Sequence, residues 1–254
     1  QEGLNAWGIW NFSQWSLLAG HVKKGFEYAK QRCTAYPRYV IQRQLLPDFL
    51  AMYTEVVGSL NFGNPFAVES ADDPFQDFDF GPVISQNKAT DLQARYDEAI
   101  RIGGIPLICG DLRAGKFIDG QDTSAYVAPA CVLNPPSNWS LHHSEPFGPL
   151  DSIVLVDTES ELLAAMNVSN GALVASIATD DPSLAQRLRP DVQSFKFGVN
   201  APRSRGDRAE VFGGRGASWR GAFVGGDLLI DSVTDGDRPL FGNFPNGSQY
   251  PPDI

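Results

Sequence analysis

Apolar residues recur at helical spacing in the first quarter of the chain. The first apolar stripe consists of Trp15, Leu18, Val22, Phe26 and Ala29, and the second consists of Phe49, Leu50, Tyr53, Val56, Val57 and Leu60. Each stripe predicts an amphipathic helix with one buried face. Ser13 is the predicted cap of the first helix, and Gly63 and Pro65 follow the second as stop signals.

Further helices are predicted from capping signals. Thr90 and Gln93 have the spacing of a capping box and predict a third helix, which stops at residues 103–104. Thr158 and Glu161 have the same spacing and predict a helix that runs through residue 166. The Asp-Pro pair at residues 181–182 predicts one more helix start, because proline suits the first helical position.

Short apolar runs between these helices predict strands at residues 39–42, 105–109, 153–156, 173–179 and 195–200. Strand and helix alternate with short connections. This order predicts an α/β fold with a mostly parallel sheet covered by helices on both faces.

The pattern changes after residue 212, where glycines interrupt the chain and a single strand is predicted over residues 228–233. We therefore expect one domain over residues 1–212 and a C-terminal extended arm with its tail over residues 213–254. We expect the arm to pack on another domain or on another subunit, which favours a homo-oligomer. The alternative is a loose C-terminus.

Charge, hydropathy and cysteine content exclude several classes of partner. The chain has 254 residues and a net charge of -10, so nucleic acid is not an expected partner. No apolar run reaches the ~18 residues of a membrane span, and we expect no membrane partner. Three cysteines far apart form no disulfide framework, and reduced thiols in a cytoplasmic protein are expected. The chain opens at Gln1 rather than Met, which suggests a mature or cleaved product.

Cys33 is the cysteine with chemical potential, because Lys30, Arg32 and Arg38 lie near it in the sequence. Basic neighbours can lower the pKa of a thiol and produce a nucleophilic thiolate. The alternative is a buried cysteine that acts as a small hydrophobic residue. Cys109 and Cys131 lie in apolar segments and are predicted to be core cysteines.

The three histidines do not have the spacing of a metal site. His21 lies on the first predicted helix and is expected to be structural, and the adjacent His142 and His143 should point apart. No bound metal is expected.

Residues 144–150 (S-E-P-F-G-P-L) form a second chemistry-bearing stretch. Two prolines and a glycine predict a rigid turn that presents Glu145 and Phe147 to the same place. A carboxylate can bind sugar hydroxyls, and a ring can pack on a flat heterocycle. A plain proline-glycine turn is the alternative.

Several motifs in order resemble those of the NAD(P)-dependent aldehyde dehydrogenases. They are Q-R-C-T-A-x-x-R-x-V at 31–40, G-N-P at 63–65, F-G-P-V-I-S at 80–85, E-A-I-x-x-G-G at 98–104, A-P-A-C-V-L at 128–133, S-E-P-F-G-P at 144–149, N-V-S-N-G-A-L-V-A-S-I-A-T-D at 167–180, V-N at 199–200 and V-F-G-G at 211–214. Their order and approximate spacing match the family from residue 31 to residue 214. Lys30 departs from the pattern, because the family usually has glycine there.

The resemblance implies a specific chemistry. Cys33 would be the thiolate that adds to an aldehyde, with its main-chain N–H helping to hold the oxyanion, and hydride transfer to NAD or NADP would leave a thioester for hydrolysis. Glu145 would bind the ribose next to the nicotinamide, Phe147 would pack by the nicotinamide, and Phe212 would line the substrate pocket.

The family is about twice as long as this chain, so the resemblance covers its C-terminal, cysteine-bearing half. The dinucleotide-binding part would lie on another polypeptide or have been removed. The general base would be Glu2 or a residue that this chain lacks. Two other functions stay open, namely a non-catalytic assembly domain that keeps the fold and a CoA-acylating aldehyde dehydrogenase.

Overall fold

The computed structural model describes residues 2–70, 72–169, 171–203 and 211–219, together with residues 225, 230 and 234. Within these residues the strands form one seven-stranded sheet in the order β3-β4-β5-β2-β1-β6-β7. The strands are β1 (Ala6–Ile9), β2 (Arg38–Gln42), β3 (Ile105–Cys109), β4 (Ala130–Leu133), β5 (Leu150–Val156), β6 (Val174–Ala178) and β7 (Lys196–Val199). Every neighbouring pair is parallel except β3 and β4. The mostly parallel sheet is therefore confirmed.

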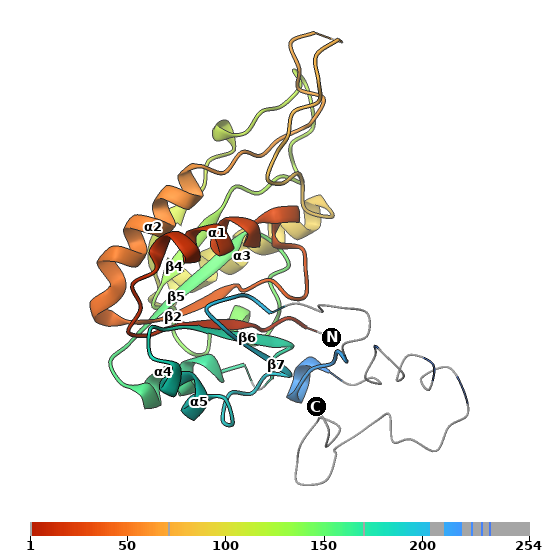
Figure 1. The fold of residues 1–254 in the computed structure, drawn as a ribbon. Coiled ribbons are helices and arrows are strands. Elements are labelled where there is room, and N and C mark those ends of the chain that lie inside the picture. The colour runs from red at the N-terminus through yellow and green to blue at the C-terminus, as the bar shows by residue number, and fades with distance from the viewer. Residues whose placement is uncertain are drawn as a thin grey trace.

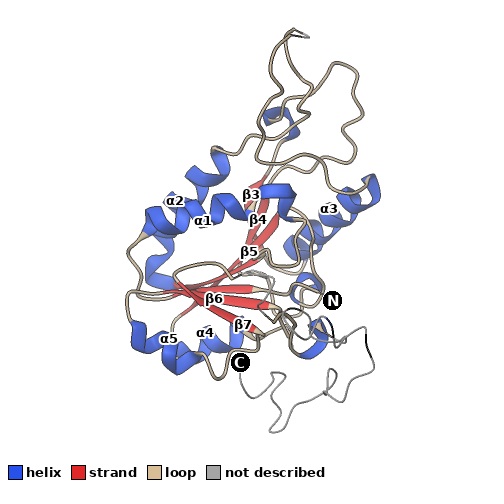
Figure 2. Ribbon diagram, turned by 45° about the vertical axis from the view of Figure 1, so that its right-hand side comes forward, coloured by secondary structure: helices blue, strands red, loops and turns tan. Residues whose placement is uncertain are grey.

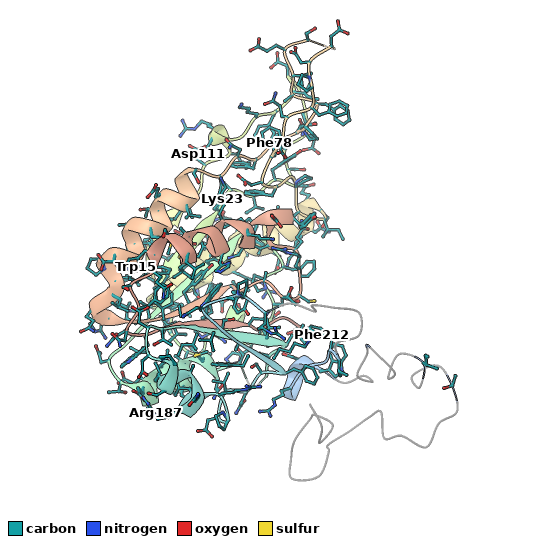
Figure 3. The ribbon with its side chains drawn as sticks, in the orientation of Figure 1. Trp15, Lys23, Phe78, Asp111, Arg187 and Phe212 are labelled. Atoms are coloured by element: carbon teal, nitrogen blue, oxygen red, sulfur yellow. The ribbon has the colours of Figure 1, made fainter. Side chains whose placement is uncertain are left out.

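Helices cover both faces of the sheet (Figures 1 and 2). One face carries α1 (Trp15–Gly25), α2 (Leu46–Gly58) and α3 (Gln86–Arg101), and the other carries α4 (Glu159–Met166) and α5 (Pro182–Leu188). Long loops project beyond α2 at the top of Figure 1, and Phe78 and Asp111 lie on them in Figure 3. The predicted α/β architecture with two covered faces is confirmed.

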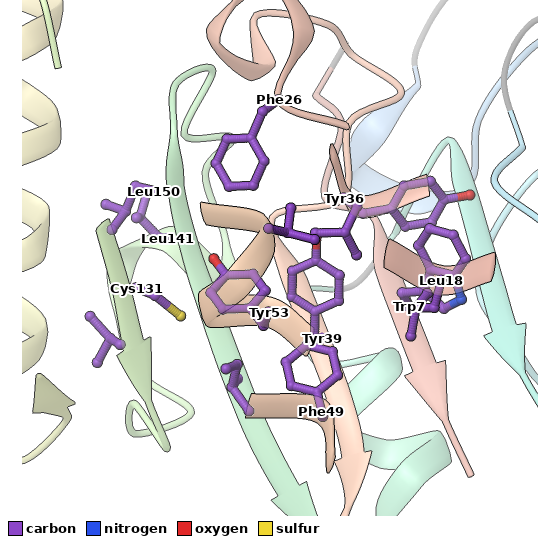
Figure 4. Packing of buried hydrophobic residues seen from close by; sticks show 14 of the residues in the cluster. Trp7, Leu18, Phe26, Tyr36, Tyr39, Phe49, Tyr53, Cys131, Leu141 and Leu150 are labelled. Carbon is purple, nitrogen blue, oxygen red and sulfur yellow. The ribbon is translucent and has the colours of Figure 1, made fainter. Parts of the chain in front are cut away.

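The larger core lies under α1, α2 and α3 and is rich in aromatic rings. Tyr39 of β2 packs against Phe49 and Tyr53 of α2, with ring centroids 5.5 and 5.8 Å away (Figure 4). Trp7 of β1 packs on Tyr36, just before β2, at 5.0 Å. Aromatic burial of this kind dominates core energetics, and it fixes the segment that precedes β2 against the helical layer.

Two predicted helix caps are wrong, although the helices exist. Ser13 does not cap α1, since Gln14 holds the cap position without a side-chain hydrogen bond and the Ser13 hydroxyl interacts with Asp180 instead. The box at Thr90 and Gln93 lies inside α3, whose cap is Ser85. A competing cap five residues earlier, Ser85, therefore decides where α3 begins. The box at residues 158 and 161 and the cap at residue 181 are confirmed.

The sheet contains two strands that the apolar pattern did not predict, β1 and β4. Each has four residues, which is too short for a clear period, and β1 contains Gly8. β5 begins at Leu150, three residues before its predicted start, because Asp151 and Ser152 interrupt the apolar run. The strand predicted over residues 228–233 and most of the predicted arm lie outside the described residues.

The position of the α3 cap can be tested by substitution. The Ser85 hydroxyl accepts a hydrogen bond from the Lys88 N–H at 3.2 Å. Ser85→Ala should lower the free energy of unfolding by about 1 kcal/mol, whereas Thr90→Ala inside the helix should change it by less than about 0.5 kcal/mol. Urea denaturation of both variants measures the difference. A larger loss for Thr90→Ala would restore the later helix start.

Candidate active site

The candidate site lies where three adjacent parallel strands begin. Gly3 precedes β1, Cys33 precedes β2 and Glu145 precedes β5, and these strands are neighbours in the order β5-β2-β1. Parallel pairing therefore brings the three segments to the same edge of the sheet. A Cβ atom on Gly3 would lie 2.0 Å from the Cys33 carbonyl oxygen and 2.6 Å from Glu145 Oε1. Only glycine permits this approach, so Cys33 and Glu145 flank the same short stretch of backbone.

Asn5 holds the turn that carries Cys33. Its Nδ2 donates to the carbonyl oxygens of Cys33 and Ala35, at 2.8 and 2.7 Å, and its Oδ1 accepts from the Val174 N–H at 3.0 Å. Asn5 is completely buried. A buried amide with all three of these bonds is costly to replace, because its partners would be left unsatisfied. Asn5 therefore ties the cysteine turn to β1 and β6.

The basic residues near Cys33 in the sequence do not serve the thiol. Lys30 is buried, and its ammonium binds the carboxylate of Asp151. The Arg32 guanidinium donates to the Lys24 carbonyl at the end of α1, at 2.7 Å, and lies 3.5 Å from Glu27. The structure therefore uses both cations elsewhere.

The backbone before Cys33 is strained. Tyr28, Ala29 and Lys30 have φ angles of 58°, 53° and 56°, a region that side-chain-bearing residues rarely adopt. Each such residue costs about 1 kcal/mol or more. A run of three persists only where the surrounding contacts determine it, and here it redirects the chain from α1 into the cysteine turn.

The thiol is exposed, yet its surroundings favour the protonated form. Partial burial and then the negative charge of Glu145 raise the pKa of Cys33, and the Cys33 N–H, which faces its own sulfur, lowers it. The hypothesis that basic neighbours lower this pKa is wrong for these residues. Among the described residues no backbone carbonyl oxygen accepts the Cys33 N–H.

The surroundings of Glu145 favour its protonated, neutral form. Burial raises its pKa to about 7, and the charge of Glu2 adds to this, while the Gly3 N–H opposes it. Phe147 follows in a left-handed conformation with φ of 48° and is half-buried. The stretch bends at residue 144 and at residues 148–149, and the charge of Glu145 acts on Cys33.

Phe212 lies in the core. Its ring packs against Phe195 and Trp219, with centroids 6.4 and 6.1 Å away, and it is labelled in Figure 3. No described contact joins it to Cys33, so its place in a substrate pocket stays a prediction.

The other two cysteines differ in burial, and His142 is a buried histidine. Cys131 is completely buried, as predicted, but Cys109 is exposed at the end of edge strand β3, and its prediction as a core residue is wrong. His142 is buried, and burial lowers its pKa to about 3. Among the described residues no group of three or more metal-binding side chains occurs, and no helix there is long and apolar enough to cross a membrane.

Sequence reasoning missed three residues that build the site, namely Gly3, Asn5 and Asp151. Gly3 and Asn5 belong to the approach to β1, which had no periodic signal. Asp151 could have been found from the sequence. A charged residue near the start of an otherwise apolar strand requires a buried partner.

The fold and the site define an α/β domain with an exposed cysteine beside a half-buried carboxyl group. A family model described as the aldehyde dehydrogenase family matches residues 2–234. The chain belongs to this family.

Individual relatives are distant and longer. The chain is 26% identical over 195 residues to 3,6-anhydro-alpha-L-galactose dehydrogenase of Vibrio sp. (strain EJY3), an alignment that covers 76% of this chain and 38% of the relative. The structure of lactaldehyde dehydrogenase from Escherichia coli matches with a TM-score of 0.76 at 21% identity. The match covers 91% of this chain and 46% of that one. A second structure is NADP-dependent glyceraldehyde-3-phosphate dehydrogenase from Bacillus halodurans, complexed with NADP. It matches with a TM-score of 0.73 at 24% identity, over 89% of this chain and 44% of that one. The chain therefore spans less than half the length of these relatives.

The raised pKa of Glu145 predicts a pH-dependent contribution to stability. The folded protein binds this proton more tightly than the unfolded chain, so the free energy of unfolding falls as the pH rises from about 4.5 to about 7. Glu145→Gln should remove this loss. Relative to the parent protein, the variant should gain about 1–3 kcal/mol between pH 5 and pH 8, measured by urea denaturation.

Glu55→Gln on the exposed face of α2 is the matched control for the loss of one negative charge. A difference between Glu145→Gln and the parent protein that stays constant with pH would contradict the assigned surroundings of Glu145.

Proposed function

We propose that this chain supplies the nucleophile for NAD(P)-dependent oxidation of an aldehyde to a carboxylic acid, with Cys33 as the nucleophile. One observation carries the proposal. The exposed thiol and the N–H of Cys33, before β2, lie close to the carboxyl group of Glu145, before β5, and both residues flank Gly3, before β1. Structural cysteines are usually buried and inert, as Cys131 is. The motif match at residues 31–40 adds the family's cysteine position.

The chain's own groups account for the covalent steps. The Cys33 thiolate attacks the aldehyde carbon and forms a C–S bond, and the carbonyl π electrons move to oxygen. The Cys33 N–H is placed to donate to that oxyanion, because it faces the sulfur. A bound NAD(P)⁺ would supply the acceptor for the hydride that this carbon must lose as the C=O bond re-forms. The resulting thioester on Cys33 is cleaved by water, which releases the acid and returns the thiol.

The residues present fit the nicotinamide end of such a cofactor. The Gly3 N–H donates to Glu145, and the positive charge of Lys88 affects its pKa less than burial and Glu2 do. Its carboxylate oxygens can accept hydrogen bonds from two ribose hydroxyls. Phe147, on the same turn, can pack against a flat ring. We therefore assign the ribose contact to Glu145 and the nicotinamide contact to Phe147. The place of Phe212 in the substrate pocket is proposed from the V-F-G-G motif alone.

The substrate is proposed only as an aldehyde. The names of relatives include lactaldehyde, betaine aldehyde and N-succinylglutamate 5-semialdehyde dehydrogenases, which share the aldehyde group and little else. These names favour the oxidative function over a non-catalytic assembly domain or a CoA-acylating enzyme.

The proposed division of the enzyme follows from length. Residues 1–212 form the catalytic domain and residues 213–254 the arm, while a dinucleotide-binding part completes the active enzyme. Glu2, whose charge reaches Glu145, is one candidate for the general base, and the missing part is the other. The assembly is proposed to be a cytoplasmic homo-oligomer.

Cys33→Ala should abolish aldehyde oxidation in the enzyme that contains this chain, with a loss of at least about 10³-fold in kcat, because the covalent intermediate cannot form. NAD(P)H formation at 340 nm measures it, and circular dichroism checks the fold. Cys109→Ala, at the other exposed cysteine, is the matched control and should keep full activity. Oxidation by Cys33→Ala above a trace would refute the assignment.

Glu145→Gln should separate cofactor use from acylation. The KM for NAD(P) should rise about tenfold, because a charged hydrogen-bond acceptor is lost. Acylation of Cys33 by an activated ester, which needs no cofactor, should stay unchanged or accelerate, because the loss of this charge lowers the pKa of Cys33. Equal losses in both reactions would argue against a ribose contact.

A further inference from the structure

Lys30 closes the base of the turn that carries Cys33. It stands three residues before the cysteine, and Tyr36 stands three residues after it. The Lys30 ammonium donates to the Tyr36 carbonyl oxygen at 3.1 Å, so one side chain joins the two ends of the turn. Inside the turn, the Arg32 N–H donates to the Lys30 carbonyl at 2.8 Å and the Ala35 N–H to the Arg32 carbonyl at 2.9 Å.

The ammonium is buried in a completed polar network. The Lys30 side chain is 2% exposed and its partner Asp151 is 0% exposed, so both charges have left water. Asp151 also accepts from the Tyr53 hydroxyl at 2.8 Å. The ammonium lies 4.5 Å from the Phe26 ring centroid and 5.5 Å from that of Tyr39, and Figure 4 shows these rings from close by.

A buried ion pair is weak evidence for stability, because desolvation offsets the attraction between the charges. Its other effect is to define one geometry, since each charge must meet its partner. Here the partners come from three elements, namely the turn itself, β5 and α2. Lys30 itself joins the turn to β5, and Tyr53 of α2 only adds a second bond to Asp151.

Lys30 also stands at a position where the backbone is left-handed, with φ of 56°, and where the resemblance expects glycine. A glycine would adopt this conformation without strain. A lysine there keeps the strained conformation and adds a side chain that reaches Tyr36. Compared with glycine, lysine at this position adds backbone strain but also supplies the hydrogen bond to Tyr36.

We propose that Lys30, with Asp151 as its counter-ion, is a positioning residue for Cys33. The anchor fixes the main chain on both sides of Cys33 and with it the position of the Cys33 N–H, a group that favours the thiolate. Lys30 acts through the turn rather than on the substrate, because its ammonium is occupied by Asp151 and Tyr36. This inference rests on the proposed role of Cys33 as the nucleophile.

The test uses the charge-free double variant Lys30→Met/Asp151→Asn, since either single substitution leaves a charge or a donor buried without its partner. The rate of iodoacetamide alkylation at Cys33 is measured against pH by peptide mass spectrometry. Cys109, the other exposed cysteine, is the internal reference. The midpoint of the Cys33 profile should move up by about 0.5–1 pH unit, which lowers its rate at pH 7 about three- to tenfold, and Cys109 should not change.

Two matched controls separate positioning from general loosening. Tyr53→Phe removes one hydrogen bond to Asp151 and leaves the contact from Lys30 to Tyr36 in place. Arg38→Met removes another buried cation, whose guanidinium contacts the carbonyls of Leu4 and Met166 and not the turn. Both variants should keep the Cys33 profile of the parent protein.

A Cys33 profile in the double variant that matches the parent protein, or one that moves to lower pH, would overturn the inference. An equal upward shift in Arg38→Met would also overturn it, because any lost buried cation would then loosen the turn. Failure of the proposed function looks different. In that case Cys33→Ala keeps oxidation, whereas the comparison of alkylation profiles is still valid.

Discussion

The parallel pairing of β5, β2 and β1 is the constraint on which the candidate site depends. In this register Arg38 lies opposite Ala6 on one side and Ser152 on the other. The segments that precede these three residues carry Gly3, Cys33 and Glu145. A slip by one residue would turn every side chain of a strand to the opposite face. The site would then lose both the approach of Gly3 to Cys33 and the charge coupling between Cys33 and Glu145.

Buried polar residues surround this edge of the sheet, in positions where an apolar core is normal. Asn5, Lys30 and Asp151 are each at most 3% exposed, and each has hydrogen-bond partners from distant parts of the chain. Such residues add little net stability, but they permit few alternative arrangements. The strained backbone at residues 28–30 is compatible with this environment, because strain persists where neighbouring contacts determine the conformation.

The fold was largely predictable because its longer elements have strong local signals. The helical stripes of α1 and α2 and the capping box of α4 identify elements that the structure contains. β1 and β4, with four residues each, were not predicted. Cys33 and Glu145 were identified as candidates from their motifs, but their proximity was not. It depends on β1, the strand that the sequence pattern missed, and on the backbone approach at Gly3.

The electrostatics of the site oppose the chemistry that its residues suggest, and this opposition has a physical consequence. Cys33 and Glu145 each have a raised pKa, and the charge of Glu145 is one of the causes for Cys33. Two neighbouring groups that both become anions disfavour each other's ionisation. Positive charge beside this pair, or a hydrogen-bond donor to either anion, lowers these pKa values. Burial and the charge of Glu145 therefore both favour the thiol form of Cys33, and any group that offsets this charge favours the thiolate.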